Sequence, residues 1–301
     1  MWVYGREVVP LEIAARKLRG YYGDDSDFRF RTQLMLYGST NYARRGRLRP
    51  AEIQELLAAN TTLHSVSSLC QNSLPFRRGV RAVITYNYDD FLEKSLSTYP
   101  YQTIWRAEKL KPRTLPIFHV HGYIPAKGNG GSRMDEVVLT EDQYNRASQD
   151  LYSWQNLVQI NALSGSVGLM VGLSLTDRNL RRILDALKNL PQEVENYALL
   201  QRPRSWNVDD HDIDSILEIM KYRINNGFEA GYGEKEIARL EKPDVREKIF
   251  DAGRALEKQD LRRGETMLKE LGVRTIRYED HTEVKEIMDQ INAAAPRAKS
   301  G

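Results

Sequence analysis

The sequence contains very little cysteine. Cys70 is the only one among 301 residues. A tetrahedral structural zinc site of the kind built from two Cys-x-x-Cys pairs therefore cannot be assembled, and no zinc is expected. We expect Cys70 to be a small core residue on a helix, because a reactive thiol needs an electropositive neighbourhood.

Long apolar runs and a large excess of charge are also absent. No apolar run reaches the length needed to cross a bilayer, and Met1–Arg6 does not begin a signal peptide. The net charge is only +3, so no general affinity for nucleic acid follows. A hydrophobic content of 41% argues against disorder. These features predict a folded cytoplasmic protein that binds neither nucleic acid nor membrane directly.

Strands alternate with helices through the middle of the chain. Such alternation implies right-handed crossovers and predicts an α/β fold, with a Rossmann-like, mostly parallel sheet flanked by helices and a helical insertion near the C-terminus. We expect one domain over residues 1–301. Its predicted parts are a helical N-terminal part (1–79), the core sheet (80–201), the helical insertion (202–271) and a final strand and helix (272–295).

Several individual elements can be predicted from local patterns. Helix-like spacing covers Pro50–Leu69, and Glu136–Leu139 resembles a short strand. Thr140 is a candidate N-cap, with Gln143 three residues later as in a capping box. Charged helices are expected at Asp212–Asn226, Glu234–Lys242 and Asp244–Lys269, then a strand at Val273–Tyr278 and a helix at Glu283–Ile291.

Two apolar runs in the core region end in polar residues. Ala82–Phe91 contains Asn87 and Asp89 after a β-branched run, and Pro116–Gly122 places His121 after another. The carboxyl ends of neighbouring parallel strands share one crevice, where ligands bind. An amide, a carboxylate and an imidazole that can carry a proton near neutral pH are suited to catalysis there.

These segments resemble the sirtuin-like superfamily of NAD-consuming proteins. The family has a Thr-x-Asn-x-Asp segment after one strand, matched from Thr85, and a His-Gly pair after the next, matched at His121. A third segment, Gly168–Leu180, resembles the strand, Gly-x-Ser-Leu-x-Asp-x-Asn loop and helix of the bacterial defence-type NAD hydrolase branch. The three motifs occur in the family's order over roughly residues 80 to 200.

One family feature is not found. Members open with a strand and a Gly-Ala-Gly-Ala/Val-Ser loop whose backbone N–H groups approach the pyrophosphate of the cofactor. No such loop occurs between Met1 and Gly79. Either this chain lacks that strand and loop through truncation or a late start codon, or the protein has lost cofactor binding. We favour the former, because the downstream residues that resemble a catalytic site are intact.

The resemblance implies an NAD⁺ hydrolase (NADase) that cleaves the bond between nicotinamide and ribose. In that reading NAD is the substrate, Asn87 orients water or the ribose hydroxyls, and His121 acts as general base. Asp89 would hold the carboxamide. The remaining predicted cofactor-binding residues are Thr85, Gly172, Ser174 and Asp177.

A purely structural role is an alternative at most of these positions. Asn-x-Asp after a strand often forms a turn and helix N-cap, and Asp177 or Ser174 can equally satisfy a helix or strand end. His119 alternates with His121 on one strand face, so the family's His-Gly pairing alone selects His121. We expect His119 to support the site from behind.

The resemblance also bears on partners. Defence-type members resemble antiphage effectors that stay silent until they assemble, so we expect a homo-oligomer, a partner protein such as a HerA-type ATPase or an Argonaute-like protein, or both. The charged helices of residues 212–269 are a candidate docking surface, or a solvated face. The rival hypothesis is a non-catalytic sirtuin-like scaffold subunit of a defence complex with an ATPase or nuclease. A protein deacylase is less favoured, because deacylating sirtuins carry the zinc ribbon.

Overall fold

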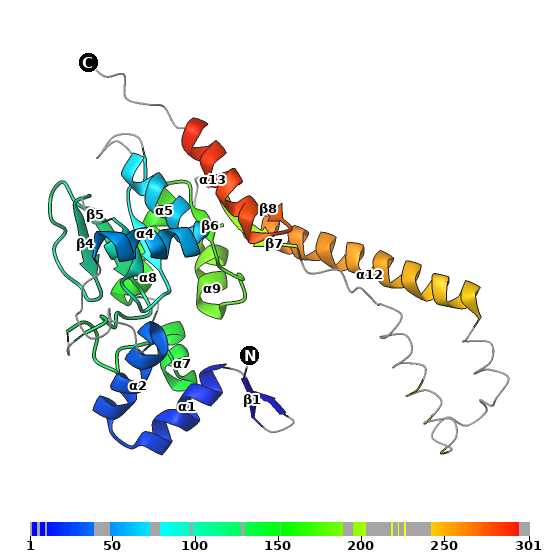
Figure 1. Cartoon of the computed structure of the whole chain (residues 1–301), viewed down its shortest axis with the longest axis horizontal. Coiled ribbons are helices and arrows are strands. Elements are labelled where there is room, and N and C mark those ends of the chain that lie inside the picture. The colour runs from blue at the N-terminus through cyan, green and yellow to red at the C-terminus, as the bar shows by residue number, and fades with distance from the viewer. Residues whose placement is uncertain are drawn as a thin grey trace. The chain divides into compact units, whose positions relative to one another are not determined.

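The chain forms two compact units. The computed structural model describes residues 2–4, 7–9, 11–38, 49–72, 79–96, 99–127, 130–150, 152–188, 195–202, 218, 222, 226 and 242–294. The first unit comprises Met1–Gly168, Ser174–Val194 and Asp280–Gly301, and the second comprises Leu169–Leu173 and Glu195–Glu279. Figure 1 shows the elements of both along the chain.

The sheet of the first unit consists of three parallel strands. They are β3 (Val83–Thr85), β4 (Tyr101–Ile104) and β5 (Leu115–His119), in the order β3-β5-β4. We call it the first sheet. Thr85 pairs with His119, so β3 and β5 end at the same level. Their carboxyl ends therefore meet at one edge of the sheet, as the sequence predicted.

Successive residues of β5 enter cores on opposite faces of this sheet, as the two-residue period of a strand requires. Ile117 packs with Cys70, Leu96 and Leu115, whereas Phe118 packs with Ile104, Val120 and Trp154. The first cluster draws on helices α5 (Thr61–Asn72) and α6 (Phe91–Ser95), and the second draws on α8 (Trp154–Gly165).

Cys70 lies in the first of these clusters. It is buried on α5, as predicted, and burial raises the pKa of its thiol to about 12. Its thiolate is therefore scarce at neutral pH, which makes Cys70 a packing residue.

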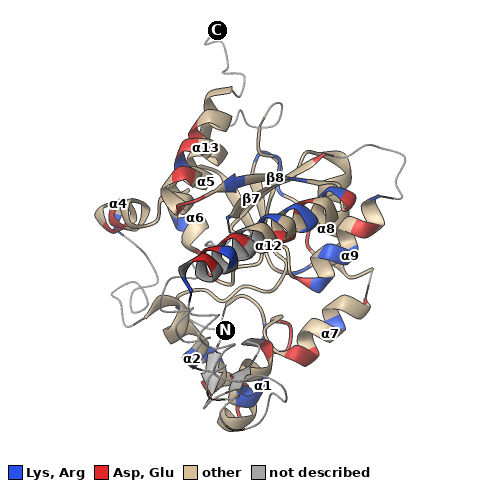
Figure 2. Ribbon diagram, turned by 90° about the vertical axis from the view of Figure 1, so that its right-hand side faces the viewer, with Lys and Arg blue, Asp and Glu red and all other residues tan. Residues whose placement is uncertain are grey.

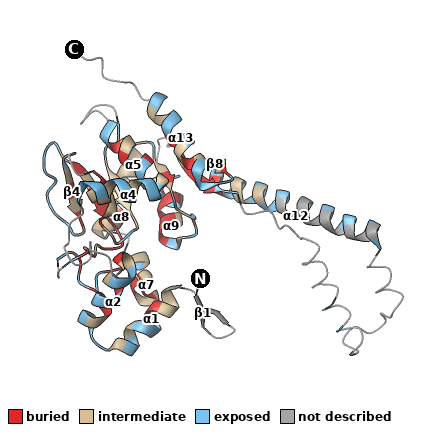
Figure 3. Ribbon diagram, viewed as in Figure 1, coloured by how far each residue is buried: buried red, intermediate tan, exposed pale blue. Residues whose placement is uncertain are grey.

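The other described elements of the first unit are mostly helical. They are the antiparallel strands β1 (Trp2–Tyr4) and β2 (Glu7–Val9) and helices α1 (Leu11–Tyr22), α2 (Asp25–Tyr37), α4 (Pro50–Ala59), α7 (Glu141–Gln149), α9 (Arg178–Leu187) and α13 (His281–Ala294). The helix α13 packs against α5. Figure 3 shows buried residues on α5 and α9.

The second unit contains its own parallel sheet. Its strands are β6 (Leu169–Val171), β7 (Asn196–Gln201) and β8 (Val273–Tyr278), in the order β6-β7-β8. We call it the second sheet. The long helix α12 (Pro243–Glu270), which carries charges of both signs, leads into β8 (Figure 2). The parallel sheets and flanking helices confirm the predicted Rossmann-like α/β class.

The strand after the predicted insertion pairs with the strand before it. β8 lies beside β7 along its whole length, from Val273 opposite Asn196 to Tyr278 opposite Gln201. That pairing was the reason for expecting one domain, and the number of domains stays a prediction. Two expected helices lie largely outside the described residues: Glu234–Lys242 apart from Lys242, and Asp212–Asn226 apart from three residues.

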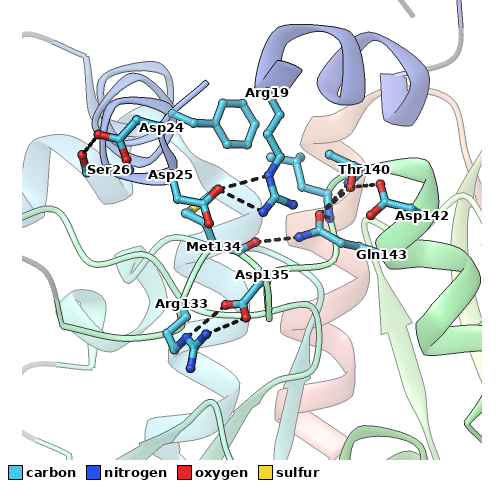
Figure 4. Close-up of polar contacts among 12 residues, drawn as sticks. Arg19, Asp24, Asp25, Ser26, Arg133, Met134, Asp135, Thr140, Asp142 and Gln143 are labelled. Carbon is cyan, nitrogen blue, oxygen red and sulfur yellow. Dashed lines mark hydrogen bonds and ion pairs between the residues drawn. The ribbon is translucent and has the colours of Figure 1, made fainter. Parts of the chain in front are cut away.

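The predicted capping box of α7 is present. The backbone N–H of Thr140 donates to Gln143 Oε1 at 2.9 Å, and Gln143 Nε2 donates to the carbonyl of Met134 at 2.6 Å (Figure 4). Gln143 thus fixes both the start of α7 and the segment before it.

Two predicted elements are wrong. Glu136–Leu139 is not a strand, because Glu136 ends the turn of residues 134–136 and the residues after it pair with no strand. A single backbone bond joins the Val138 N–H to the His121 carbonyl. Pro50–Leu69 is two helices, α4 and α5. The Asn60 side chain accepts from the N–H of Leu63 at 2.9 Å and so caps a new helix at that point.

No described helix has both the length and the apolar character that a membrane span requires.

Candidate functional site

The ends of β3 and β5 bring polar residues of the first unit to one edge of the sheet. They are Thr85, Asn87, His119 and His121. The carbonyl of Thr85 accepts from the N–H of Val120 at 3.2 Å, which continues the strand pairing beyond His119. Asn87 follows β3 by two residues, and His121 follows β5 by two. β5 ends at His119, so His121 lies in a turn and not on the strand.

Asn87 has an exposed side chain on a firmly held backbone. Its N–H donates to Thr85 Oγ1 at 3.0 Å. Its carbonyl lies 3.0 Å from His119 Nδ1. Because both backbone groups are bonded, the amide side chain projects from a fixed point.

Asp89 is partly buried and forms a local turn. Its Oδ1 accepts from the N–H of Phe91 at 3.1 Å, and burial raises its pKa above the ordinary value. The N-cap position of α6 is held by Asp90, which is buried, makes no side-chain cap bond and lies 3.6 Å from Lys94 Nζ. The alternative in which this segment forms a turn and a helix N-cap therefore applies in part. Asp89 forms the turn, and Asp90 occupies the N-cap position of the helix.

His121 is buried among aromatic rings. Only 6% of it is exposed, and the rings of Tyr86 and Tyr144 meet it edge to face at 4.6 and 5.3 Å between centroids. Burial lowers its pKa to about 4, while the nearby carboxylate of Asp177 acts in the opposite direction. His121 is therefore neutral at pH 7, and its ring nitrogens make no hydrogen bond within the part of the chain that the structure describes.

The glycine of the His-Gly pair is required by geometry. Gly122 has a φ of +103°, and a Cβ there would come within 3.1 Å of the Cα of Val137. Any side chain would strain this turn and displace the neighbouring backbone. The pair is thus a tight turn that directs the chain away from β5 just after the imidazole.

The loop that follows β6 contains two residues in the left-handed region. Gly172, in the second unit, has a φ of +71°. A Cβ there would meet no atom within 4 Å, so the backbone conformation alone favours glycine. Leu175, in the first unit, has a φ of +57° although its side chain is buried. Such a conformation is costly for a branched residue and clusters at functional sites.

The remaining predicted residues of this loop make local bonds. Ser174 Oγ lies 2.7 Å from Thr176 Oγ1. Asp177 is the N-cap of α9, since its Oδ1 accepts from the N–H of Leu180 at 2.7 Å. The capping reading of Asp177 is confirmed. The same carboxylate also acts electrostatically on His121.

Asn179 of the same motif joins two helices. Its Nδ2 donates to Asn156 Oδ1 of α8 at 2.7 Å, and both side chains are buried. A satisfied buried amide pair is specific in geometry, so it fixes the start of α9 against α8.

The sequence prediction missed two kinds of residue. The first is Glu93, a buried carboxylate on α6 that meets His119. The second is the aromatic lining of His121 formed by Tyr86 and Tyr144. The only signal for Glu93 was indirect, because a histidine on a buried strand, here His119, needs a polar partner.

Within the described ranges, no cluster of three or more His, Cys, Asp or Glu side chains could hold a metal ion.

The α/β class of the fold and the buried imidazole at the strand ends agree with the comparison with known families. Residues 81–225 match the family model of the SIR2-like domain, which supports assignment to the sirtuin-like superfamily. The match covers the Asn87, His121 and Asp177 motifs. Comparison with curated proteins gives no match.

Proposed function

We propose that the site at the ends of β3 and β5 cleaves the bond between nicotinamide and ribose in NAD⁺. The observation that carries the proposal is His121, a buried and neutral imidazole in the sirtuin-like segment. Sirtuin-like proteins are NAD-related, and this reaction needs a positioned base and electrostatic stabilisation more than a strong acid.

His121 supplies the base in this proposal. A neutral ring nitrogen accepts a proton from water or from a ribose hydroxyl. A pKa of about 4 makes it a weak base. Asp177 offsets this weakness, because its carboxylate favours the imidazolium that forms during the reaction.

Asn87 and Asp89 position the substrate. The exposed amide of Asn87 orients the attacking water or the ribose hydroxyls from a held backbone. Asp89 is held in its turn by the N–H of Phe91. Its carboxyl oxygens accept hydrogen bonds, as the NH₂ group of a carboxamide requires.

The residues that begin at Ser174, in the first unit, contact the adenosine side in this proposal. Ser174 offers an exposed hydroxyl for that contact. Thr85 contributes by holding the Asn87 N–H.

The test is nicotinamide release. The 301-residue chain is incubated with NAD⁺ across a wide range of protein concentrations, and nicotinamide is quantified by chromatography. We expect release that rises more steeply than protein concentration, since assembly activates the site. Intact NAD⁺ at every concentration would contradict the proposal.

The biological setting that we propose is antiphage defence. The Ser-Leu-x-Asp-x-Asn form of the loop, from Ser174 to Asn179, supports the defence-type branch. An effector of this kind would work as a homo-oligomer, or with a partner such as a HerA-type ATPase or an Argonaute-like protein. Depletion of cellular NAD⁺ on expression of the wild-type chain, absent with His121→Ala, is the expected outcome.

The scaffold alternative rests on a different observation. Between Met1 and Gly79 the sequence has no glycine-rich phosphate loop, and the strands described there, β1 and β2, form only an antiparallel pair. Each charge-assisted bond to a pyrophosphate is worth about 1.5–3 kcal/mol, so the loss of several leaves weak NAD⁺ binding. Titration calorimetry with this chain separates the two, since low-micromolar binding would disfavour the scaffold.

A further inference from the structure

A buried histidine–glutamate pair lies behind Asn87. His119 is 1% exposed and Glu93 is 2% exposed, and His119 Nε2 lies 2.7 Å from Glu93 Oε1. The ring of Tyr123 packs against the imidazole at 4.8 Å between centroids. Because both side chains are almost completely buried, neither contacts substrate directly.

The direction of the hydrogen bonds follows from the acceptors. The carbonyl of Asn87 can only accept, so Nδ1 of His119 carries a proton and donates to it. The opposite nitrogen, Nε2, faces Glu93 Oε1. One proton lies in that second contact, either on an imidazolium or on a neutral carboxyl.

Glu93 connects this pair to the rest of the first sheet. Its Oε1 also accepts from Thr103 Oγ1 of β4 at 3.1 Å. Its Oε2 is buried and has no hydrogen-bond partner within the described residues. An incompletely satisfied buried carboxylate costs free energy, which the contacts of Oε1 with His119 and Thr103 offset only in part.

The chain of contacts runs in one direction, from Glu93 through His119 to the backbone of Asn87. At Asn87 the carbonyl is held by His119 and the N–H by Thr85 Oγ1. The Asn87 side chain is left exposed. Rotation of this peptide would break the bond to His119 and turn the amide away.

We propose that the Glu93–His119 pair is a positioning device that fixes the backbone of Asn87 so that its amide is presented to substrate in one geometry. The inference rests on the proposed function of Asn87 in NAD⁺ cleavage. His119 and Glu93 are positioning residues, whereas His121 is the base.

Two substitutions at His119 separate its two contacts. In His119→Asn the side-chain amide nitrogen occupies the place of Nδ1, so it keeps the donor to Asn87 and leaves Glu93 without its partner. In His119→Gln the amide occupies the place of Nε2, so it keeps the contact with Glu93 and loses the donor to Asn87.

We expect the variant with the higher Tm to have the lower kcat. His119→Gln keeps Glu93 paired and has the higher Tm. It nevertheless loses kcat by roughly 100-fold, with KM little changed, because a displacement of about 1 Å at a positioned group has an effect of that size. His119→Asn has the lower Tm but recovers most of kcat. If activity instead follows Tm across the pair, His119 is a core residue only and the proposal fails.

A second measurement does not depend on NAD⁺ cleavage. Hydrogen–deuterium exchange of the segment from Tyr86 to Asp90 reports how firmly the Asn87 peptide is held. We expect faster exchange in His119→Gln and near wild-type exchange in His119→Asn. Equal exchange in both variants would overturn the positioning role even if the wild-type chain cleaves NAD⁺. If the two variants differ in exchange as expected but the wild-type chain does not cleave NAD⁺, the positioning role of His119 stands and the proposed reaction is wrong.

Discussion

The two parallel sheets differ in the burial of the titratable residues near the carboxyl ends of their strands. At the first sheet, the residues that follow or flank β3 and β5 include the buried groups His119, His121 and Glu93. At the second sheet, β7 and β8 are followed by Arg202 and Glu279, which form an ion pair of 3.0 Å with both side chains more than half exposed. The strand geometry is the same, and only the environment of the charges differs.

This difference bears on where the proposed reaction would take place. An exposed ion pair contributes about 0–1 kcal/mol and costs little to keep. A buried titratable group lowers stability unless it is paired, and perturbed pKa values cluster at functional sites. The perturbed histidine, His121, follows the first sheet, which supports the proposal that the reactive edge lies there.

The largest effect is expected from His121→Ala. Loss of a general base lowers the rate of NAD⁺ cleavage by roughly 10²–10⁴-fold. The matched control at the end of the second sheet is Gln201→Ala, an exposed residue whose loss should leave the rate within about twofold, since a surface change is usually within 0.5 kcal/mol. Nicotinamide release by both variants is the measurement. Equal loss in the two would remove the distinction between the sheets.

The second prediction compares stability at the two edges. Glu93→Ala leaves His119 without its partner, and breaking a buried pair costs about 3–5 kcal/mol. Glu279→Ala breaks the exposed pair with Arg202 and costs about 0–1 kcal/mol. Urea unfolding followed by circular dichroism measures both changes. A similar small cost in both variants would contradict the argument.

Much of the fold could be predicted from local sequence. The strand Val273–Tyr278 has the bounds predicted for it, because a β-branched run between polar residues is a strong local signal. The capping box at Thr140 was equally local. The expected strand Glu136–Leu139 failed, since Val137 and Val138 are buried without a neighbouring strand to pair with. Burial alone does not make a strand.

Candidate site residues could be named from the sequence only where a motif contained them. His121 and Asn87 were proposed from their resemblance to a family, and they follow the ends of adjacent strands. Glu93 was missed because its burial depends on His119, 26 residues away. No local pattern reports such a pairing. The same holds for Tyr144, whose contact with His121 depends on tertiary packing.

The third prediction concerns pH. The pKa of His121 is about 4 in the folded chain and 6.5 when unperturbed, so between these values the unfolded state binds more protons. The contribution of His121 to stability is therefore complete above pH 6.5 and is lost as the pH falls toward 4, by roughly 3 kcal/mol in total. Urea unfolding of wild type and His121→Ala at a series of pH values isolates this contribution by difference. In the same experiment with NAD⁺, cleavage should persist below the ordinary histidine pKa and fail only toward pH 4. A loss of activity centred near pH 6.5 would show that His121 is not the buried base.

The smallest effect is expected at Asp177, where capping and electrostatics can be separated. Asp177→Ala removes the acceptor for the Leu180 N–H and should cost about 1 kcal/mol, with a range of roughly 0.5–2. Asn is as good an N-cap as Asp, so Asp177→Asn should keep stability within about 0.5 kcal/mol of wild type. It removes the negative charge that raises the pKa of His121, so the imidazole becomes a still weaker base. We therefore expect Asp177→Asn to unfold like wild type and to cleave NAD⁺ more slowly at neutral pH. If Asp177→Asn is fully active and only Asp177→Ala is impaired, the residue serves the helix alone, and the first sheet edge works without help from that carboxylate.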